Sequence, residues 1–150
     1  MFAMIDKTRQ VTHEEDAIAG IIGLMNTLPD QLSTEIGLLF TLPAYQGTHV
    51  TRNAVGLLMQ WCFQELRVRR VQWRSYPENF ASIRAAERMG FRKERIERWG
   101  RVIDTNKPGL AVREGDVMPD RRSVHVLWLS ICWDDWVEWK ERISEIMSRP

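Results

Sequence analysis

The spacing of apolar residues changes from helical period to strand period and back between residues 54 and 89, and this alternation restricts the fold more than any other feature. From Ala54 to Leu66 the apolar side chains recur at helical spacing over a wide face, which indicates a deeply packed helix. Val71–Tyr76 then alternates apolar and polar side chains, which is the period of a strand. Asn79–Met89 returns to helical spacing, with Asn79 suited to the N-cap and Gly90 to the C′ position. These segments predict a mixed α/β architecture.

The remaining segments extend this pattern over a single domain, residues 1–150. Further runs with the composition of strands are Phe2–Ile5, Ile18–Met25, Glu35–Leu42, Phe91–Ile103 and Val124–Trp133. We expect charged residues along one face of Phe91–Ile103, whereas Val124–Trp133 is apolar on both faces, as a central strand would be. A polar turn over residues 6–16 and a long loop over residues 104–122 connect strands. A last helix, capped by Asp134 or Asp135, has four apolar residues on one stripe: Trp136, Trp139, Ile143 and Ile146.

Composition argues against several classes of function. The net charge is +1, with 21 basic and 20 acidic side chains interspersed, so no nucleic-acid partner is predicted. The longest apolar run, Ile18–Met25, is far shorter than the roughly 20 residues that span a bilayer, and the N-terminus lacks the order of a signal peptide. A soluble, cytoplasmic protein without membrane contact is therefore expected. Cys62 and Cys132 lie in apolar stretches and are predicted to be buried free thiols, with no metal site.

The junction between Glu35–Leu42 and the following helix is a candidate anion site. A strand that ends in a turn and leads into a helix exposes free backbone N–H groups at the positive end of the helix dipole, which suits a phosphate. Gly47 allows the backbone to approach a ligand closely. Further side-chain donors in this loop are Thr48, His49, Thr51 and Arg52. An ordinary strand–helix turn with threonine caps is the alternative.

A second candidate lies at the start of the next helix. Asn79 is suited to cap this helix, and Ser82 follows at its third position. Both side chains can point into the same space at the positive helix end, where a developing thiolate would be stabilised. Plain helix capping is the alternative, and it is the simpler explanation for Asn79 taken alone.

Two blocks of sequence carry a family resemblance. They are Leu42-Pro43-Ala44-Tyr45-Gln46-Gly47-Thr48-His49-Val50-Thr51-Arg52 and Asn79…Ser82-Ile83-Arg84-Ala85-Ala86-Glu87-Arg88-Met89-Gly90-Phe91. In this order and separation they resemble the GNAT superfamily of N-acetyltransferases, most closely the ribosomal-protein-alanine acetyltransferase branch in a fungal-type variant. The resemblance runs from about Phe2 to Trp133.

This resemblance implies the GNAT fold, a mixed central sheet in which two parallel strands, here Glu35–Leu42 and Val71–Tyr76, splay apart. Acetyl-CoA would lie in the gap as the acyl donor. Backbone groups of Phe40, Thr41 and Leu42 would pair with its pantetheine arm. The pyrophosphate would be held by Gln46, Gly47, Thr48, His49, Val50, Thr51 and Arg52.

The resemblance also implies catalytic roles. Asn79 would bind the cofactor arm, and Ser82 would be the general acid that protonates the leaving thiolate. Tyr76 is a reserve candidate for that acid. Glu35 is the candidate general base, with a strand-end carboxylate on the solvated side as an equal alternative.

The expected function is acetyl transfer to a primary amine of a small molecule, which could be a secondary metabolite, or of a peptide. Members of the family open with a strand and two helices that this sequence does not show. A catalytically silent module that binds CoA or a partner is therefore the alternative, and pairing of the exposed cleft edge with a second copy would give a homodimer. A nucleotide-binding protein is the third hypothesis, but the Gly-x-x-x-x-Gly-Lys and Gly-x-Gly-x-x-Gly spacings are missing.

Overall fold

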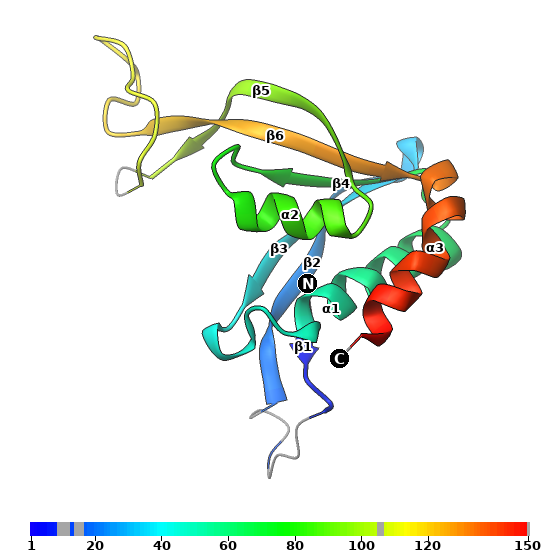
Figure 1. Ribbon diagram of the computed structural model, residues 1–150. Helices are drawn as coiled ribbons and strands as arrows, with labels where there is room; N and C mark the ends of the chain where they lie inside the picture. The colour runs from blue at the N-terminus through cyan, green and yellow to red at the C-terminus, as the bar shows by residue number, and fades with distance from the viewer. Residues whose placement is uncertain (9–12, 14–16, 105–106, 150) are drawn as a thin grey trace.

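The computed structural model describes residues 1–8, 13, 17–104 and 107–149. Within these residues the strands are β1 (Phe2–Ile5), β2 (Ile18–Leu28), β3 (Ser33–Thr41), β4 (Arg70–Ser75), β5 (Arg92–Ile103) and β6 (Arg122–Cys132). The α-helices are α1 (His49–Gln60), α2 (Phe80–Arg88) and α3 (Trp133–Ser148). The strands form one sheet in the order β1-β2-β3-β4-β6-β5 (Figure 1). Only the β3–β4 pair is parallel among the pairings of the described strands, so the predicted mixed α/β sheet is confirmed.

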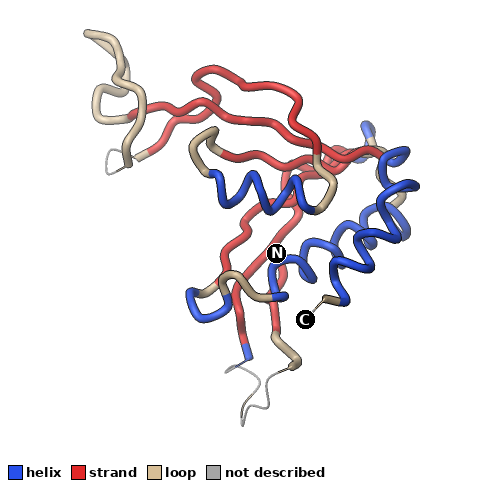
Figure 2. The backbone as a smooth tube through the Cα atoms, in the orientation of Figure 1, coloured by secondary structure: helices blue, strands red, loops and turns tan. Residues whose placement is uncertain are grey.

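The three helices share one core with alternate residues of the sheet. Val71 and Trp73 of β4 and Leu129 of β6 are almost completely buried in the same cluster as Met59 of α1 and Ile143 of α3. Helices α1 and α3 lie side by side (Figure 2). None of the helices in the described parts of the chain is long and apolar enough to cross a bilayer.

Helix α2 has the predicted residues at its two ends. Asn79 is the N-cap, and its side chain accepts a hydrogen bond from the Ser82 backbone N–H at 3.2 Å. Gly90 follows the helix with φ of +89°, a conformation that glycine adopts without strain. A Cβ at Gly90 would also come within 2.7 Å of the Trp139 ring, so both the backbone and the packing require glycine.

Helix α1 starts earlier than its apolar pattern indicated. Thr48 is its N-cap and accepts a hydrogen bond from the Val50 N–H, so the helix begins at His49. After Gln60 the chain continues as a π-helical turn, Trp61–Glu65. The apolar period located the buried middle of this helix, whereas the polar first turn carries no such signal.

One expectation about the C-terminal half is confirmed and another is wrong. Arg92, Arg95 and Glu97 pair with Ser130, Trp128 and Val126, which are alternate residues on one face of β6, so charged residues do follow one face of β5. Nearly every residue of β5 is exposed, and β5 is the edge strand beyond β6. The N-cap of α3 is Cys132, not Asp134 or Asp135. Asp135 is the third helical residue and accepts a hydrogen bond from the Cys132 N–H at 3.0 Å, which completes a capping box.

The other predicted strands are present with shifted ends. β2 continues to Leu28, where it still pairs with Ser33. Of the predicted turn over residues 6–16, most lies outside the described residues, as do residues 105–106 of the long loop. Both cysteines are free thiols, although Cys132 is only half-buried. Burial raises the pKa of Cys62 to about 12, so this thiol stays protonated.

Candidate active site

A cleft opens where β3 and β4 separate. Their parallel pairing runs only from Ser33 and Arg70 to Glu35 and Gln72, although both strands continue beyond it. A β-bulge lies just past this point, because two residues of β3 oppose one residue of β2 between the Ile21–Phe40 and Gly23–Gly37 pairs. One of the two is Leu38, with φ of +49°. The bulge bends β3 away from β4 and leaves backbone groups of β3 without a β4 partner.

A cavity of about 480 Å³ occupies this gap. Its walls come from β3, from the end of β4, from the start of α2 and from β5 and β6. Five of the predicted site residues line it together: Glu35, Phe40, Tyr76, Asn79 and Ser82. The structure therefore brings the predicted catalytic residues to one cavity. Its size is in the range of small-molecule sites.

Ser82 is held in a defined orientation. Its Oγ accepts a hydrogen bond from Trp73 Nε1 at 2.9 Å. Trp73 is buried, and its ring meets that of Phe91 edge-on, so the indole has little freedom. Because one lone pair of Oγ is engaged by the indole, the hydroxyl hydrogen of Ser82 is left to donate elsewhere.

Glu35 is buried and ion-paired. Its side chain is 7% exposed, which overturns the alternative of a solvated strand-end carboxylate. Oε2 accepts hydrogen bonds from Arg74 Nε and from Asn26 Nδ2, each at 2.7 Å. Arg74 Nη2 lies 2.6 Å from the same oxygen. All three contacts converge on Oε2, so a role as base would fall to Oε1.

Tyr76 also lines a second hollow. This hollow has a volume of about 520 Å³ and a mostly apolar lining, and it shares Tyr76 and Asn79 with the first cavity. Its other walls include Ile103 and Leu110, the latter from the loop between β5 and β6. Part of the long loop over residues 104–122 therefore forms a wall of a pocket beside the cleft.

The loop from Gln46 to Arg52 presents backbone groups, whereas its side chains are engaged elsewhere. Gly47 has φ of +75°, and a Cβ there would meet nothing within 4 Å. Thr48 Oγ1 donates to the Tyr45 carbonyl at 2.7 Å, and His49 Nε2 lies 3.4 Å from Asp6 Oδ1. The first N–H groups of α1 have no partner within the helix and point out of its N-terminus.

The remaining side chains of this loop also have partners within the protein. Gln46 Nε2 donates to the Thr41 carbonyl at 3.2 Å. Thr51 Oγ1 lies 2.9 Å from Thr41 Oγ1, and Arg52 donates to the carbonyl of Arg149. The expectation that these side chains supply donors to a phosphate finds no support in their arrangement.

Thr41 and Leu42 lie beyond the cavity, on the way from β3 to this loop. Phe40 and Thr41 pair with Ile21 and Gly20 of β2, and the Leu42 N–H donates to the Ala19 carbonyl at 2.8 Å. A Cβ at Gly20 would come within 2.0 Å of the Phe40 carbonyl oxygen, so only glycine fits this close approach. One edge of this segment is thus paired with β2, and the other faces the gap.

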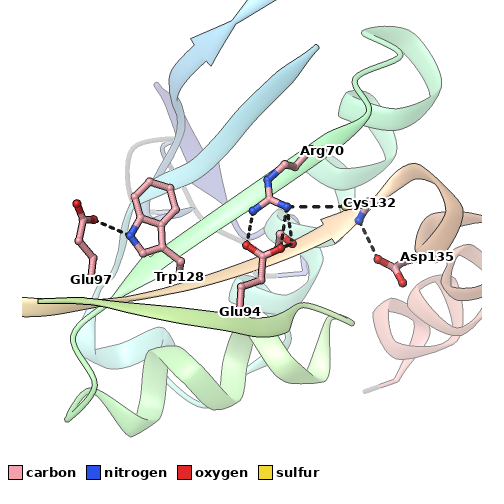
Figure 3. A network of polar contacts seen from close by, with 7 residues as sticks. Arg70, Glu94, Glu97, Trp128, Cys132 and Asp135 are labelled. Carbon is pink, nitrogen blue, oxygen red and sulfur yellow. Dashed lines mark hydrogen bonds and ion pairs between the residues drawn. The ribbon is translucent and has the colours of Figure 1, made fainter. Parts of the chain in front are cut away.

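The face of the sheet opposite to Trp73 carries a polar network (Figure 3). Arg70 pairs with Glu94, and Ser130 Oγ donates to the same carboxylate at 2.7 Å. The hydrogen bond from Arg70 holds the pKa of Glu94 below its ordinary value. Trp128 Nε1 donates to Glu97 at 2.7 Å. This network connects β4, β6 and β5 and lies outside the cavity.

The cavity residues that the sequence did not predict include Trp73, Arg74 and Ser75. They are consecutive residues of β4, and their alternation of apolar and polar side chains predicts a strand but not a site. The available signal was the polar residue Ser75 on the face of β4 that otherwise carries Val71 and Trp73. A serine on the buried face of a strand, just before the chain leaves the sheet, is a candidate for a site.

The chain matches a known family over most of its length. A family model described as "Acetyltransferase (GNAT) domain" matches residues 2–92. The "Probable N-acetyltransferase YjcK" of Bacillus subtilis (strain 168) is 31% identical over 87 residues, which are 58% of this chain and 48% of that protein.

Solved structures agree with this match. A GCN5-related N-acetyltransferase from Brucella melitensis superposes with a TM-score of 0.76 at 29% identity, over 97% of this chain and 56% of that one. A structure titled as a probable acetyltransferase of the GNAT family, from Chromobacterium violaceum ATCC 12472, gives a TM-score of 0.64 at 28% identity, over 81% of this chain and 53% of that one. The chain spans about half the length of these relatives. With its splayed parallel strands and the helix that starts at the cleft, this chain belongs to the GNAT acetyltransferase family.

Proposed function

We propose that this chain is an acetyl-CoA-dependent N-acetyltransferase that transfers an acetyl group to a primary amine. The observation that carries this proposal is the cavity between β3 and β4, which gathers Ser82, Tyr76 and Glu35 around one space. The cavity also fits the acyl donor, because β3 offers backbone groups along it that β4 does not use. Acetyl-CoA supplies an activated thioester, whose C–S bond breaks as the C–N bond to the amine forms.

The protein residues would then transfer two protons: they would accept one from the amine and donate one to the thiolate. The amine must lose a proton as it attacks, and Glu35 Oε1 is the proposed acceptor, directly or through a water. The CoA thiolate must gain a proton as it leaves, and the hydroxyl of Ser82 is the proposed donor. The bond from Trp73 occupies an acceptor lone pair of Ser82, which leaves its hydroxyl hydrogen for the sulfur. Tyr76 is the second candidate donor.

The nucleotide end of the donor would lie at the start of α1. Backbone N–H groups and the positive helix end there suit a pyrophosphate. Because His49, Thr51 and Arg52 are engaged within the protein, we assign this binding to the backbone of the loop around Gly47 rather than to side chains.

Gly47→Asp tests this assignment. Gly47 has a positive φ and open space around it, so Asp is accommodated with modest backbone strain. Its carboxylate would repel the pyrophosphate and occupy the approach to the helix start. We expect the Kd for CoA, measured by calorimetry, to rise about 10-fold or more, in keeping with 1.4 kcal/mol per tenfold change.

Gly115→Asp is the matched control, because Gly115 has φ of +70° and equally open surroundings in the loop between β5 and β6. This variant should bind CoA like the wild type. Gly47→Asn separates charge from size and should weaken binding less than Gly47→Asp. Equal CoA affinity in the two aspartate variants would contradict the pyrophosphate assignment.

The acceptor is proposed to be a small molecule or a peptide N-terminus with an apolar body. The second hollow supports this, because its apolar lining begins at Tyr76, beside the proposed reaction centre. The resemblance to the ribosomal-protein-alanine branch favours a peptide amine, and the fungal-type variant favours an amine from secondary metabolism. Release of free thiol from acetyl-CoA with a panel of such amines tests the proposal. Turnover with none of them, by a sample that binds acetyl-CoA, would contradict it.

Binding without turnover is the second candidate function. The hydrogen bonds of Glu35 favour it, because Oε2 already accepts bonds from Arg74 and Asn26 and is therefore not free to accept a proton from an amine. A silent module would bind acetyl-CoA and CoA and release no thiol with any amine. The same assay therefore distinguishes the two candidates.

A further inference from the structure

Ser75, the last residue of β4, carries a buried hydroxyl that the fold does not use. The residue is 8% exposed, and its Oγ has no hydrogen-bond partner among the described residues. A buried polar group without a partner destabilises a folded protein, and such groups are rare in native structures. Their persistence at a cavity is typical of sites that bind a ligand.

This hydroxyl lies on the face of the sheet that meets α2. Side chains of a strand alternate between faces, so Ser75 shares the face of Trp73, whose indole contacts Ser82 of α2. Arg74, between them, points to the other face, where it pairs with Glu35 and lies over the Trp128 ring. Ser75 also lines the cavity between β3 and β4.

The two serines of the cavity differ in their partners. Ser82 accepts a bond from Trp73, whereas Ser75 has both its donor and its acceptor capacity unused by the described residues. A neutral hydroxyl matches a neutral carbonyl or amide better than it matches an ammonium group. The charged group that suits an acceptor amine is Glu35, which lines the same cavity from β3 and pairs with Arg74.

We infer that Ser75 is a ligand-binding residue of this cleft, whose Oγ–H donates a hydrogen bond to a carbonyl of the acyl-pantetheine arm of the donor. This inference rests on the proposed function, since it takes acyl-CoA as the occupant of the cavity. It adds a side-chain contact from β4 to the backbone contacts that β3 can offer. The bound arm would satisfy a hydroxyl that is unsatisfied in the free protein.

The test is calorimetric titration of wild type and Ser75→Ala with acetyl-CoA, CoA and 3′-phospho-ADP, the nucleotide part of CoA that lacks the arm. Loss of one neutral hydrogen bond predicts a 5- to 10-fold higher Kd for ligands that carry the arm, about the value of a single such bond. The Kd for 3′-phospho-ADP should not change. The melting temperature of the free variant should stay equal or rise by about 1–3 °C, because an unsatisfied buried group is removed.

Ser33→Ala is the matched control. Ser33 is also a buried strand serine whose Oγ has no partner among the described residues, but it does not line the cavity. It should bind all three ligands like the wild type. Ser75→Cys, which keeps the volume and weakens the hydrogen bond, should fall between wild type and Ser75→Ala.

The outcomes separate this inference from the function on which it rests. Failure of the wild type to bind any of the three ligands would overturn the proposed function and, with it, the occupant assumed here. Wild-type binding of acetyl-CoA with an unchanged Kd in Ser75→Ala would overturn the role of Ser75 alone. A lower melting temperature with unchanged binding would show that a buried water satisfies the hydroxyl for the benefit of the fold, which also overturns it.

Discussion

Ser82→Ala is expected to lower kcat about 100-fold while the Kd for acetyl-CoA stays within twofold of wild type, since a positioned general acid contributes factors of this size. The reason is the location of the hydroxyl, which lines the cavity and has its acceptor side engaged by Trp73. Removal of the hydroxyl leaves thiolate departure without a proton donor and leaves the binding groups of β3 and α1 in place. Steady-state thiol release and calorimetry on the same sample measure the two quantities.

Two controls keep this result interpretable. Ser82→Ala also deprives the buried Trp73 N–H of its acceptor, which costs about 1–3 kcal/mol of unfolding free energy. Trp73→Phe removes the same hydrogen bond and retains Ser82, so a much smaller loss of kcat in that variant would assign the effect to the hydroxyl. Ser144→Ala, in the exposed part of α3, should behave like wild type. A parallel loss of affinity and turnover in Ser82→Ala would contradict the role of general acid.

Arg74→Ala is expected to lower the unfolding free energy by about 2–4 kcal/mol, because it leaves the buried Glu35 carboxylate without its cation. Asn26 alone would then hold Oε2. The estimate is at the lower end for buried pairs because the Arg74 side chain is 25% exposed. Urea denaturation with an unchanged m-value measures the difference.

Arg95→Ala is the matched control for this variant. Both guanidinium groups lie over the Trp128 ring, at 4.9 Å for Arg74 and 4.2 Å for Arg95, but only Arg74 pairs with Glu35. Loss of the stacked cation alone should cost less than about 1 kcal/mol. Glu35→Gln in the Arg74→Ala background should recover part of the lost stability, because the buried charge is gone. Equal losses in Arg74→Ala and Arg95→Ala would show that the ion pair contributes nothing.

The sequence predicted best the elements whose ends carry residues with a specific capping role. Helix α2 was predicted to within a residue because Asn79 and Gly90 have specific conformational roles at its ends. The sheet followed from the period of its strands, and the family blocks around Gly47 and Ser82 indicated which two strands separate. What the sequence could not provide was the position of the bulge at Leu38, because a leucine with positive φ has no sequence signature.

The sequence predicted the main residues of the site but not the partners that orient them. Ser82, Tyr76 and Glu35 do line one cavity. Partners that orient two of them come from neighbouring strands nine residues away along the chain: Trp73 of β4 for Ser82 and Asn26 of β2 for Glu35. Whether a side chain faces a ligand or a neighbour depends on tertiary contacts. His49 and Arg52 show this, because the His49 imidazole lies next to Asp6 and the Arg52 guanidinium donates to the Arg149 carbonyl instead of pointing to the helix start. The sequence shows Ser75 as a polar residue on the apolar face of β4, but it does not show that the hydroxyl is buried without a partner beside a cavity.

The most direct test of the account is calorimetric titration of the chain with acetyl-CoA, because every proposed role depends on an acyl donor between β3 and β4. The account predicts saturable binding with one site per chain, weakened by Gly47→Asp and by Ser75→Ala and not by Ser82→Ala. A sample with native circular dichroism and cooperative unfolding that takes up no acetyl-CoA would contradict the central claim that this cleft is an acyl-CoA site.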